Sequence, residues 1–494
     1  MPLPKLSKVG LPAMKNLIQF RIASIILISI VASQNILADQ RPNVMVILCD
    51  DLGYGDLECY GHPAIKTPTL NRLAADGIRF TDCYSAAPVC SPSRVGLLTG
   101  RSPNRAGVYD WIPNADKPVS NKRHLVHMRE KEKTIASFLQ SAGYATCLVG
   151  KWHCNSEFNR PQQPQPDTFG FEHWFATQNN ASPSHRNPNN FVRNGSDAGA
   201  IEGFSCQVVA DEAIHWLEQK EKDKPFFLYV AFHEPHEPVA SPAEIVAEYL
   251  DDARTEDEAQ YFANVANMDL AVGRIMKSLT RLNLDENTLI IFTSDNGPET
   301  LNRYRSANRS YGQPGPLRGM KLHTTEAGFR VAGIIKWKNH LPQSMIGTVN
   351  QTTISSLDLL PTICELAHLS LPKEMHLDGT SITSLLQGNE LTREKPLTWI
   401  YYNAINEARV AMRHERWKVL AKLDGGSLPK LTNVTKDSLP LIQQAKLTDI
   451  EIYDLKNDTS EMQNIAKVNR ELTIELTERL QREYQNLVMD SHAW

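Results

Sequence analysis

Short apolar runs that stop abruptly at polar residues recur along the N-terminal part of the chain. The run N-V-M-V-I-L-C-D-D at 43–51 is rich in β-branched residues and ends in two acids, as a buried central strand does when it meets a functional loop. Three later runs, at 144–153, 225–238 and 287–297, have the same form. We therefore predict four strands that deliver polar groups to one edge of one sheet.

Helical patterns alternate with these strands. Residues 67–77 and 133–143 each have a capping residue, apolar positions at helical spacing and a terminal glycine, and 258–279 is a longer candidate. Alternation at this length predicts an α/β fold with a large, mostly parallel sheet sandwiched by helices. The segment 155–200, rich in Pro, Asn, Gln and Ser, is predicted to form long loops.

The pattern changes near residue 390. The chain then reads as short strands at 399–402, 409–413, 417–423 and 451–455, followed by a polar helix to the end. We predict a main domain at 39–390 and a smaller C-terminal α+β subdomain at 391–494.

The first 38 residues differ in pattern from the rest of the chain. Lys15 and Arg21 precede an apolar run at 22–32, and small residues at Ser33 and Ala38 offer cleavage sites, which is the pattern of a secretory signal peptide at 1–38. Neither this run nor any later one reaches the length of a spanning helix. We expect an exported protein, periplasmic, secreted or lumenal, without a transmembrane helix in the mature chain; a retained N-terminal anchor is the alternative.

Composition narrows the class of protein. The 494 residues are 41% hydrophobic and 22% charged, which is typical of a soluble globular protein of two or three domains. The formal net charge of -4 gives no broad positive field, so no nucleic acid is expected as a partner. Eight cysteines show no paired C-x-x-C zinc pattern, and their spacing does not decide which of them form disulfides.

Acidic and amide side chains follow two of the predicted strands. Asp50 and Asp51 end the first, and Asp295 and Asn296 end the last. Either pair alone is more often a solvated turn, but together they supply hard oxygen ligands suited to Ca²⁺ or Mg²⁺.

Basic side chains end the other two strands. In G-K-W-H, Lys151 and His153 are two residues apart, so they leave an extended segment on the same face. The stretch H-E-P-H-E-P offers His233 and His236, and R-G-M-K offers Lys321. Lysines, histidines and a divalent cation around one point describe a site for a phosphate or sulfate ester.

The stretch V-C-S-P-S-R-V-G-L-L-T-G-R at 89–101 resembles the signature of the type I, formylglycine-dependent sulfatases of the alkaline-phosphatase-like superfamily. The motifs D-D-L-G-Y-G-D, G-K-W-H, H-E-P-H, S-D-N-G and R-G-M-K follow the order of that family, and the likeness extends from Arg41 to the C-terminus. Arylsulfatases and glycan sulfatases of the N-acetylgalactosamine-6-sulfate type are similar.

This resemblance implies that Cys90 is oxidised to formylglycine by a maturation enzyme and that its hydrated form is the nucleophile. A second hydroxyl on the hydrated aldehyde explains how the enzyme can expel sulfate, which a thiol adduct could not do. The implied ligands of one Ca²⁺ are Asp50, Asp51, Asp295, Asn296 and the modified Cys90.

The family also implies a role for each basic residue. Arg94 would steady the formylglycine, and Lys151 and Lys321 would hold the sulfate oxygens. His236 would protonate the leaving oxygen as general acid, and His153 would accept a proton from the second hydroxyl. If disulfides form, we expect them among the other seven cysteines.

The expected substrate is a sulfated glycan or an aryl sulfate ester, with the glycan preferred. The aromatic and amide-rich loops at 169–180 and 184–190 are the candidate recognition wall, with His173, Trp174, His185 and Arg186 as its contacts. Two other readings remain open: a phosphodiesterase or phosphonate monoester hydrolase of the same superfamily, and a protein that binds sulfated glycans without turning them over.

Overall fold

The computed structural model of the protein describes residues 1–4, 41–116 and 119–494. Apart from residues 1–4, the predicted signal peptide lies outside the described residues. Residues 43–494 form one compact unit. In the part of the chain that the structure describes, no helix combines the length and the apolar character needed to cross a membrane.

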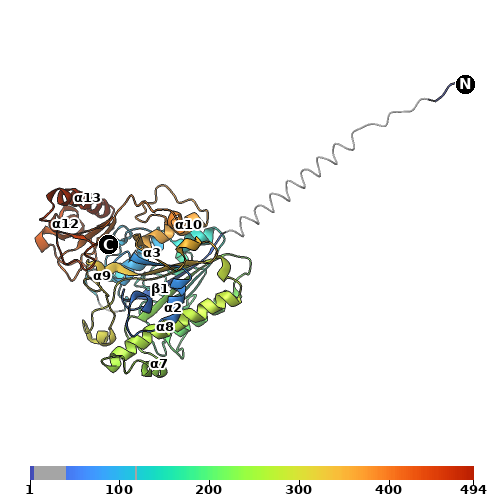
Figure 1. Cartoon of the computed structure of the whole chain (residues 1–494), viewed down its shortest axis with the longest axis horizontal. Helices are drawn as coiled ribbons and strands as arrows, with labels where there is room; N and C mark the ends of the chain where they lie inside the picture. Colours follow the sequence, from blue (N-terminus) through green and yellow to red (C-terminus); the bar gives the residue numbers. More distant parts are fainter. Residues whose placement is uncertain (5–40, 117–118) are drawn as a thin grey trace. The chain divides into compact units, whose positions relative to one another are not determined.

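One large sheet of eleven described strands forms the centre of this unit (Figure 1). The strands are β1 (Asn43–Asp50), β2 (Ile78–Tyr84), β3 (Ala145–Lys151), β4 (His173–Thr177), β5 (Val192–Arg193), β6 (Ser196–Asp197), β7 (Phe226–Pro235), β8 (Thr288–Ser294), β9 (Arg330–Trp337), β10 (Thr348–Asn350) and β11 (Ile354–Ser355). Their order is β10-β2-β9-β8-β1-β7-β3-β4-β5-β6, with β11 paired to β2. The central strands β8, β1, β7, β3 and β4 are parallel, which confirms the predicted fold class.

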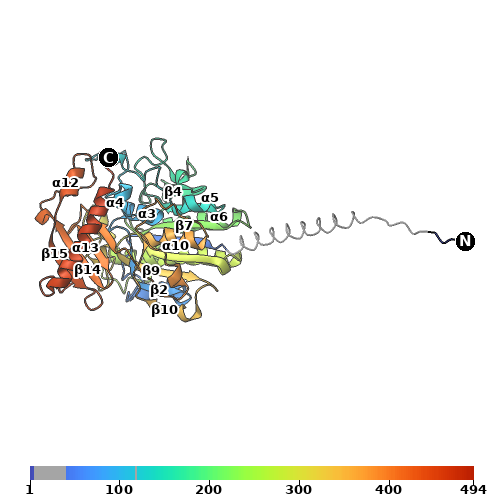
Figure 2. The same cartoon turned by 90° about the horizontal axis from the view of Figure 1, so that it is seen from above.

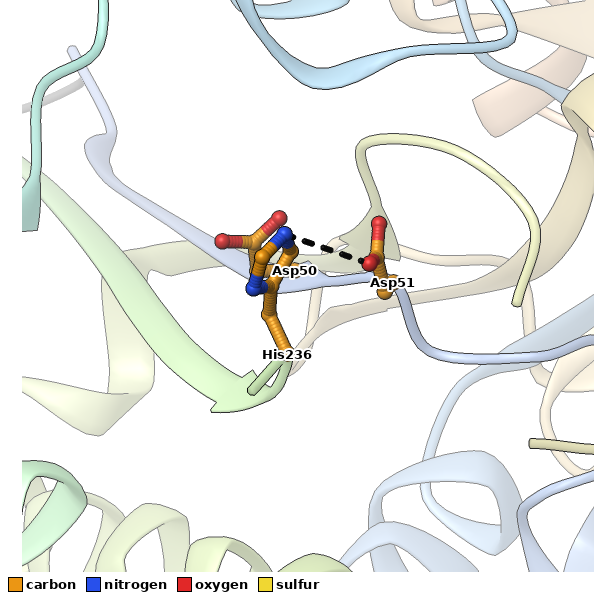
Figure 3. Close-up of side chains that lie close together, drawn as sticks. All are labelled: Asp50, Asp51 and His236. Carbon is orange, nitrogen blue, oxygen red and sulfur yellow. Dashed lines mark ion pairs between the residues drawn. The ribbon is translucent and has the colours of Figure 1, made fainter. Parts of the chain in front are cut away.

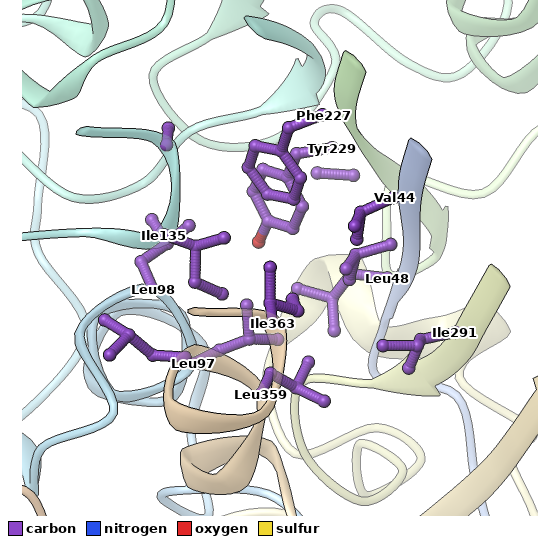
Figure 4. Close-up of a cluster of buried hydrophobic side chains, with 14 of the residues drawn as sticks. Val44, Leu48, Leu97, Leu98, Ile135, Phe227, Tyr229, Ile291, Leu359 and Ile363 are labelled. Carbon is purple, nitrogen blue, oxygen red and sulfur yellow. The ribbon is translucent and has the colours of Figure 1, made fainter. Parts of the chain in front are cut away.

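Helices cover both faces of this sheet because successive side chains of a strand point to opposite sides. Val44 and Leu48 of β1 lie in one apolar cluster, and Met45 and Ile47 lie in the other. The first cluster contains α3 (Cys90–Thr99), α5 (Ile135–Ser141) and α10 (Leu359–Leu366), as Figure 4 shows, and the second contains α2 (Pro68–Ala75), α6 (Ser205–Gln219) and α8 (Glu256–Arg281). Shorter helices are α4 (Pro103–Ala106), α7 (Ala243–Ala247), α9 (Glu326–Phe329) and α11 (Thr383–Leu386).

The segment 155–200 departs from the predicted long loops at β4. This strand pairs in parallel with β3, and its Trp174 and Phe175 are buried. Five residues between proline-rich and amide-rich stretches carry too short an alternation to be recognised as a strand.

The C-terminal part forms a second, antiparallel sheet in the order β12-β13-β14-β15 (Figure 2). Its strands are β12 (Leu397–Ile400), β13 (Val410–His414), β14 (Trp417–Leu423) and β15 (Leu447–Asp454), and α12 (Leu439–Gln444) and α13 (Arg470–Met489) accompany them. The predicted α+β character is confirmed. The predicted boundary near residue 390, in the stretch between α11 and β12, stays a prediction.

Buried aromatic and charged contacts join the second sheet to the first. Phe329 of α9 stacks on Trp399 of β12, with 4.1 Å between ring centroids. Lys418 of β14 has a fully buried side chain, which donates to Glu326 of α9 at 2.8 Å and lies 3.6 Å from Glu461. Burial alone would raise the pKa of Glu326, but the charge of Lys418, the strongest of several nearby cations, lowers it to about 2.

A glycine determines the backbone path near the end of β3. Gly150 has a φ of +105°, and a Cβ at this position would lie 1.9 Å from the carbonyl oxygen of Ala231 on β7. Only glycine allows this close approach, and the next residue is Lys151. The backbone path of β3 thus fixes where the Lys151 side chain begins.

We expect Lys418→Met to lower the free energy of unfolding by about 3 kcal/mol, because it leaves the buried Glu326 carboxylate without its main partner. Urea denaturation measures the change. Lys422→Met is the matched control on the same strand, since Lys422 pairs with the exposed Glu407 and its loss should change little. Equal stability of the Lys418→Met variant and the wild type would contradict a structural role for this ion pair.

Candidate active site

Four adjacent parallel strands end at one edge of the large sheet, and ionisable or amide side chains lie at or just beyond each end. These residues are Asp50 at the end of β1 and Asp51 after it, Lys151 at the end of β3, His236 after β7, and Asp295 and Asn296 after β8. All six are buried. Open α/β sheets bind their ligands at this edge, so the topology gathers residues that are far apart in the sequence.

Cations partner the buried acids. Lys151 Nζ donates to Asp50 Oδ2 at 2.5 Å, and Lys321 Nζ donates to Asp51 Oδ2 at 2.7 Å. Arg94, on the first turns of α3, donates to Asp295 Oδ2 through Nε at 3.0 Å and Nη2 at 2.7 Å. Each carboxylate therefore has a cation of its own, which offsets the cost of burying it.

The pKa values of the three acids separate because their partners differ in strength. Burial raises the pKa of all three, but Lys151 and the other cations around Asp50 hold its pKa well below the usual range. For Asp51 and Asp295 the effect of burial exceeds that of the nearby cations, and it raises their pKa to about 6 and about 7 respectively. Asp50 is thus the most firmly ionised of the three.

Two buried oxygen atoms in this cluster, Asp50 Oδ1 and Asn296 Oδ1, have no hydrogen-bond partner among the described residues. A buried acceptor without a partner is costly, so each calls for a ligand. Asn296 Nδ2 donates to Asp51 Oδ1 at 2.6 Å, so Asn296 Oδ1 points away from this carboxylate. Carboxylate and amide oxygens are the ligands that Ca²⁺ prefers, so this donor set fits a hard divalent cation.

A candidate metal site is formed by Asp50, Asp51 and His236 (Figure 3), whose ligand atoms lie within 4.8 Å of one another. The predicted ligand set did not contain His236. Its Nε2 lies 3.4 Å from Asp51 Oδ2, the ion pair that Figure 3 marks. Conversely, Asp295 Oδ2 is taken by Arg94, and Asp295 Oδ1 accepts from the backbone N–H of Asp51 at 3.2 Å.

Cys90 is the first residue of α3 and is 3% exposed. Burial raises the pKa of its thiol to about 11, despite the ammonium groups of Lys151 and Lys321 nearby. At neutral pH only about 1 thiol in 10⁴ is then ionised, so the unmodified side chain is a poor nucleophile. All eight cysteines lie within the described ranges and all are free thiols.

A cavity of about 480 Å³ opens onto Cys90. Its volume is in the range of small-molecule sites, about 300 to 1,000 Å³. It is lined by Val89, Cys90, Trp111, His153, Asn179, Asn180, His236, Glu237, Arg303, Tyr304, Ser306, Lys321, Leu322 and Asn403.

Two histidines line this cavity, and opposite ring nitrogens of the two are held by backbone carbonyl groups. His153 Nε2 lies 2.9 Å from the carbonyl oxygen of Ile112, to which it must donate, and His153 Nδ1 has no partner in the described part of the chain. His236 Nδ1 likewise lies 2.8 Å from the carbonyl oxygen of Glu237, leaving Nε2 toward Asp51. Burial lowers the pKa of His153 well below its usual range and that of His236 to about 4.

The four residues predicted as the recognition wall do not line this cavity. His173 Nε2 lies 2.9 Å from Glu212 Oε1, and Trp174 is buried on β4, between β3 and β5. His185 is fully buried beside Asn264, and Arg186 is exposed. Of the two loops predicted to form this wall, the loop at 169–180 reaches the cavity through its last two residues, Asn179 and Asn180.

Sequence reasoning missed the other wall residues because they come from distant segments. Trp111, Arg303, Tyr304 and Asn403 belong to no motif of fixed spacing. Glu299 had a usable signal, since it follows S-D-N-G by one proline and its carboxylate lies 3.6 Å from Lys321 Nζ.

Comparison with known proteins agrees with this geometry. The profile of the Sulfatase family matches residues 42–369, and that of the N-sulphoglucosamine sulphohydrolase C-terminal family matches residues 321–487. The chain is 34% identical over 381 residues to N-acetylgalactosamine-6-sulfatase of Canis lupus familiaris, covering 74% of this chain and 69% of the relative. It is 32% identical over 456 residues to arylsulfatase A of Homo sapiens, covering 86% and 83%.

Solved structures give the same result. The structure of Ps i-CgsB in complex with k-i-k-neocarrahexaose superposes with a TM-score of 0.74 at 26% identity, covering 92% of this chain and 94% of that one. The fold, the family profile and the identity to curated relatives therefore agree that this chain belongs to the sulfatase family of sulfuric ester hydrolases.

Proposed function

We propose that this enzyme removes sulfate from a sulfated glycan, using a formylglycine derived from Cys90 and one bound Ca²⁺. The observation that carries the proposal is the cavity in which Cys90, two histidines and Lys321 meet above the buried acids. The names of the relatives support the substrate class, since one acts on N-acetylgalactosamine 6-sulfate and another binds a neocarrahexaose.

The buried cations of the site bind the sulfate group. Lys321 lines the cavity, and Lys151, which is paired with Asp50, donates to Oδ1 of the lining residue Asn180 at 3.4 Å. An ester sulfate carries negative charge that grows on the leaving oxygen as the bond breaks, and fixed cations in a buried site stabilise that charge. Glu299 shares Lys321 with Asp51, so the ammonium group has a defined position before substrate binds.

The proposed chemistry also needs two groups that the encoded side chains do not supply, formylglycine and Ca²⁺. Hydrated formylglycine supplies one hydroxyl for attack on sulfur and a second whose deprotonation releases sulfate. Asp50, Asp51 and Asn296 would hold Ca²⁺ through their oxygen atoms, and the ion would supply positive charge beside the cavity. Lys151 donates to Asp50 and Lys321 donates to Asp51. A divalent cation on these carboxylates would compete with both ammonium groups, which would then be available for sulfate oxygens.

His153 and His236 each take part in a different proton transfer, His153 as general base and His236 as general acid. His153 Nδ1 carries a lone pair toward the cavity, because its Nε2–H is held by Ile112, and therefore suits the general base. His236 donates its Nδ1–H to Glu237, so its Nε2 is the atom that exchanges a proton with the leaving oxygen. An anionic substrate beside Nε2 favours the protonated ring and thus the role of general acid.

Hydrolysis of paired esters tests the proposed reaction. Protein coexpressed with a formylglycine-generating enzyme should hydrolyse aryl sulfates and sulfated oligosaccharides, and the Cys90 peptide should have the lower mass of the aldehyde. Cys90→Ala should abolish turnover, whereas Cys59→Ala, a matched free thiol outside the cavity, should not. A much higher efficiency on phosphodiesters would assign a different reaction, and an unmodified Cys90 in native protein would favour glycan binding without turnover.

Removal of the metal tests the proposed cation. Dialysis against a chelator should lower activity by more than about 100-fold, and added Ca²⁺ should restore it and raise the midpoint of thermal unfolding. Asp51→Asn should weaken Ca²⁺ binding measured by calorimetry, while Asp211→Asn, an exposed acid paired with Arg274, is the control. Full activity after verified removal of all divalent cations would refute a role for Ca²⁺.

Export of the chain is part of the proposal and rests on the sequence of the first 38 residues. Mass mapping of the mature protein from its source should find an N-terminus near residue 39 and no peptide containing Lys15 or Arg21. Recovery of those peptides from the mature protein would support the retained anchor instead.

A further inference from the structure

Trp111 is a large aromatic side chain at the rim of the cavity, and no step of the reaction uses it. It is 37% exposed, although the residues before and after it, Asp110 and Ile112, are 2% and 1% exposed. An indole left partly in water between two buried neighbours has a surface available for a ligand.

Hydrogen bonds tie the backbone of Ile112, the residue after Trp111, to the reaction centre. Ile112 N–H donates to the hydroxyl of Ser91, the residue after Cys90, at 2.9 Å. The carbonyl oxygen of the same Ile112 accepts from His153. Trp111 is therefore fixed relative to both the nucleophile position and the proposed general base.

The buried carboxylate of Asp110 holds Trp111 from the other side. Its Oδ1 accepts from the Trp111 backbone N–H at 2.8 Å and from Tyr401 at 2.9 Å, and its Oδ2 accepts from Asn403 Nδ2 at 3.0 Å. Tyr401 and Asn403 follow β12, so the C-terminal part of the chain fixes this side of the cavity.

One face of the indole already has a partner. The guanidinium of Arg123 lies 4.3 Å from the ring centroid and donates to the carbonyl oxygen of Trp111. This contact holds the ring plane, and the exposed part of the indole, which lines the cavity, can contact a ligand. A platform held in this way loses little conformational entropy on binding.

We propose that Trp111 is the platform on which a pyranose ring of the substrate packs, which makes it a determinant of glycan specificity. This inference rests on the proposed function. A pyranose has an apolar C–H face and a rim of hydroxyl groups, and it matches one aromatic surface surrounded by polar side chains. Asn179, Asn180, Ser306 and Asn403 supply such a polar surround, and Asn179 Oδ1 has no partner within the described ranges.

Truncation of the ring tests the platform. With k-i-k-neocarrahexaose and a chondroitin oligosaccharide carrying N-acetylgalactosamine 6-sulfate as probes, Trp111→Ala should lower kcat/KM on the better substrate by about 10- to 100-fold, mainly through KM. Trp111→Phe should recover most of the loss. The inhibition constant of inorganic sulfate should not change, because sulfate binds below the platform.

The matched control is Trp417→Ala, which removes another partly exposed tryptophan with an arginine over its ring, on β14 outside the cavity. It should leave kcat/KM unchanged. Asp110→Asn should give a smaller loss than Trp111→Ala, again through KM, if Asp110 positions the platform.

Three results would overturn the platform: unchanged kcat/KM on the oligosaccharide in Trp111→Ala, an equal loss on 4-nitrophenyl sulfate, or an equal weakening of sulfate inhibition. Calorimetric binding of the oligosaccharide separates this inference from the proposed function. If the wild type hydrolyses no sulfate ester, the proposed function fails, and weaker oligosaccharide binding by Trp111→Ala would still support the platform. If the wild type is active and binding by Trp111→Ala is unchanged, the platform alone fails.

Discussion

The neutralisation of buried charge at the end of β1 is the constraint on which the rest of the structure depends. Three carboxylates, Asp50, Asp51 and Asp295, are paired with three cations, Lys151, Lys321 and Arg94, and all six side chains are buried. Each charge would be costly alone, so none of the elements that carry these side chains can shift independently. The parallel order of β8, β1, β7 and β3 is what brings them together.

The same balance explains why the site is suited to an anion. Without a metal the acids and bases nearly cancel, and a divalent cation added to the carboxylates gives the base of the cavity a net positive charge. The start of α3 at Cys90 adds the partial positive charge of a helix N-terminus on the same side. The single negative charge of an ester sulfate would offset part of this positive charge. Asp50 Oδ1 and Asn296 Oδ1, which have no hydrogen-bond partner among the described residues, are the atoms proposed to bind the cation.

Much of this arrangement could be predicted from the sequence, because each apolar strand ends in the residues that do chemistry. Asp50, Lys151 and Asp295 follow runs whose periodicity and length identify buried strands, and parallel topology then requires a common edge. The substrate wall could not be predicted in this way. Trp111 and Asn403 lie in irregular segments whose position depends on tertiary contacts, and β4 is too short to show its period.

The shared hydrogen bonds of Asp110 make the two sheets interdependent in a way that no motif records. Tyr401 and Asn403 belong to the segment after β12, yet they reach the carboxylate that orients the cavity rim. A chain that ended before residue 396 would retain all the sequence motifs of the reaction centre and would lose one side of the cavity. Changes in substrate preference during evolution can therefore arise from how the last hundred residues dock, with the reacting groups themselves unaltered.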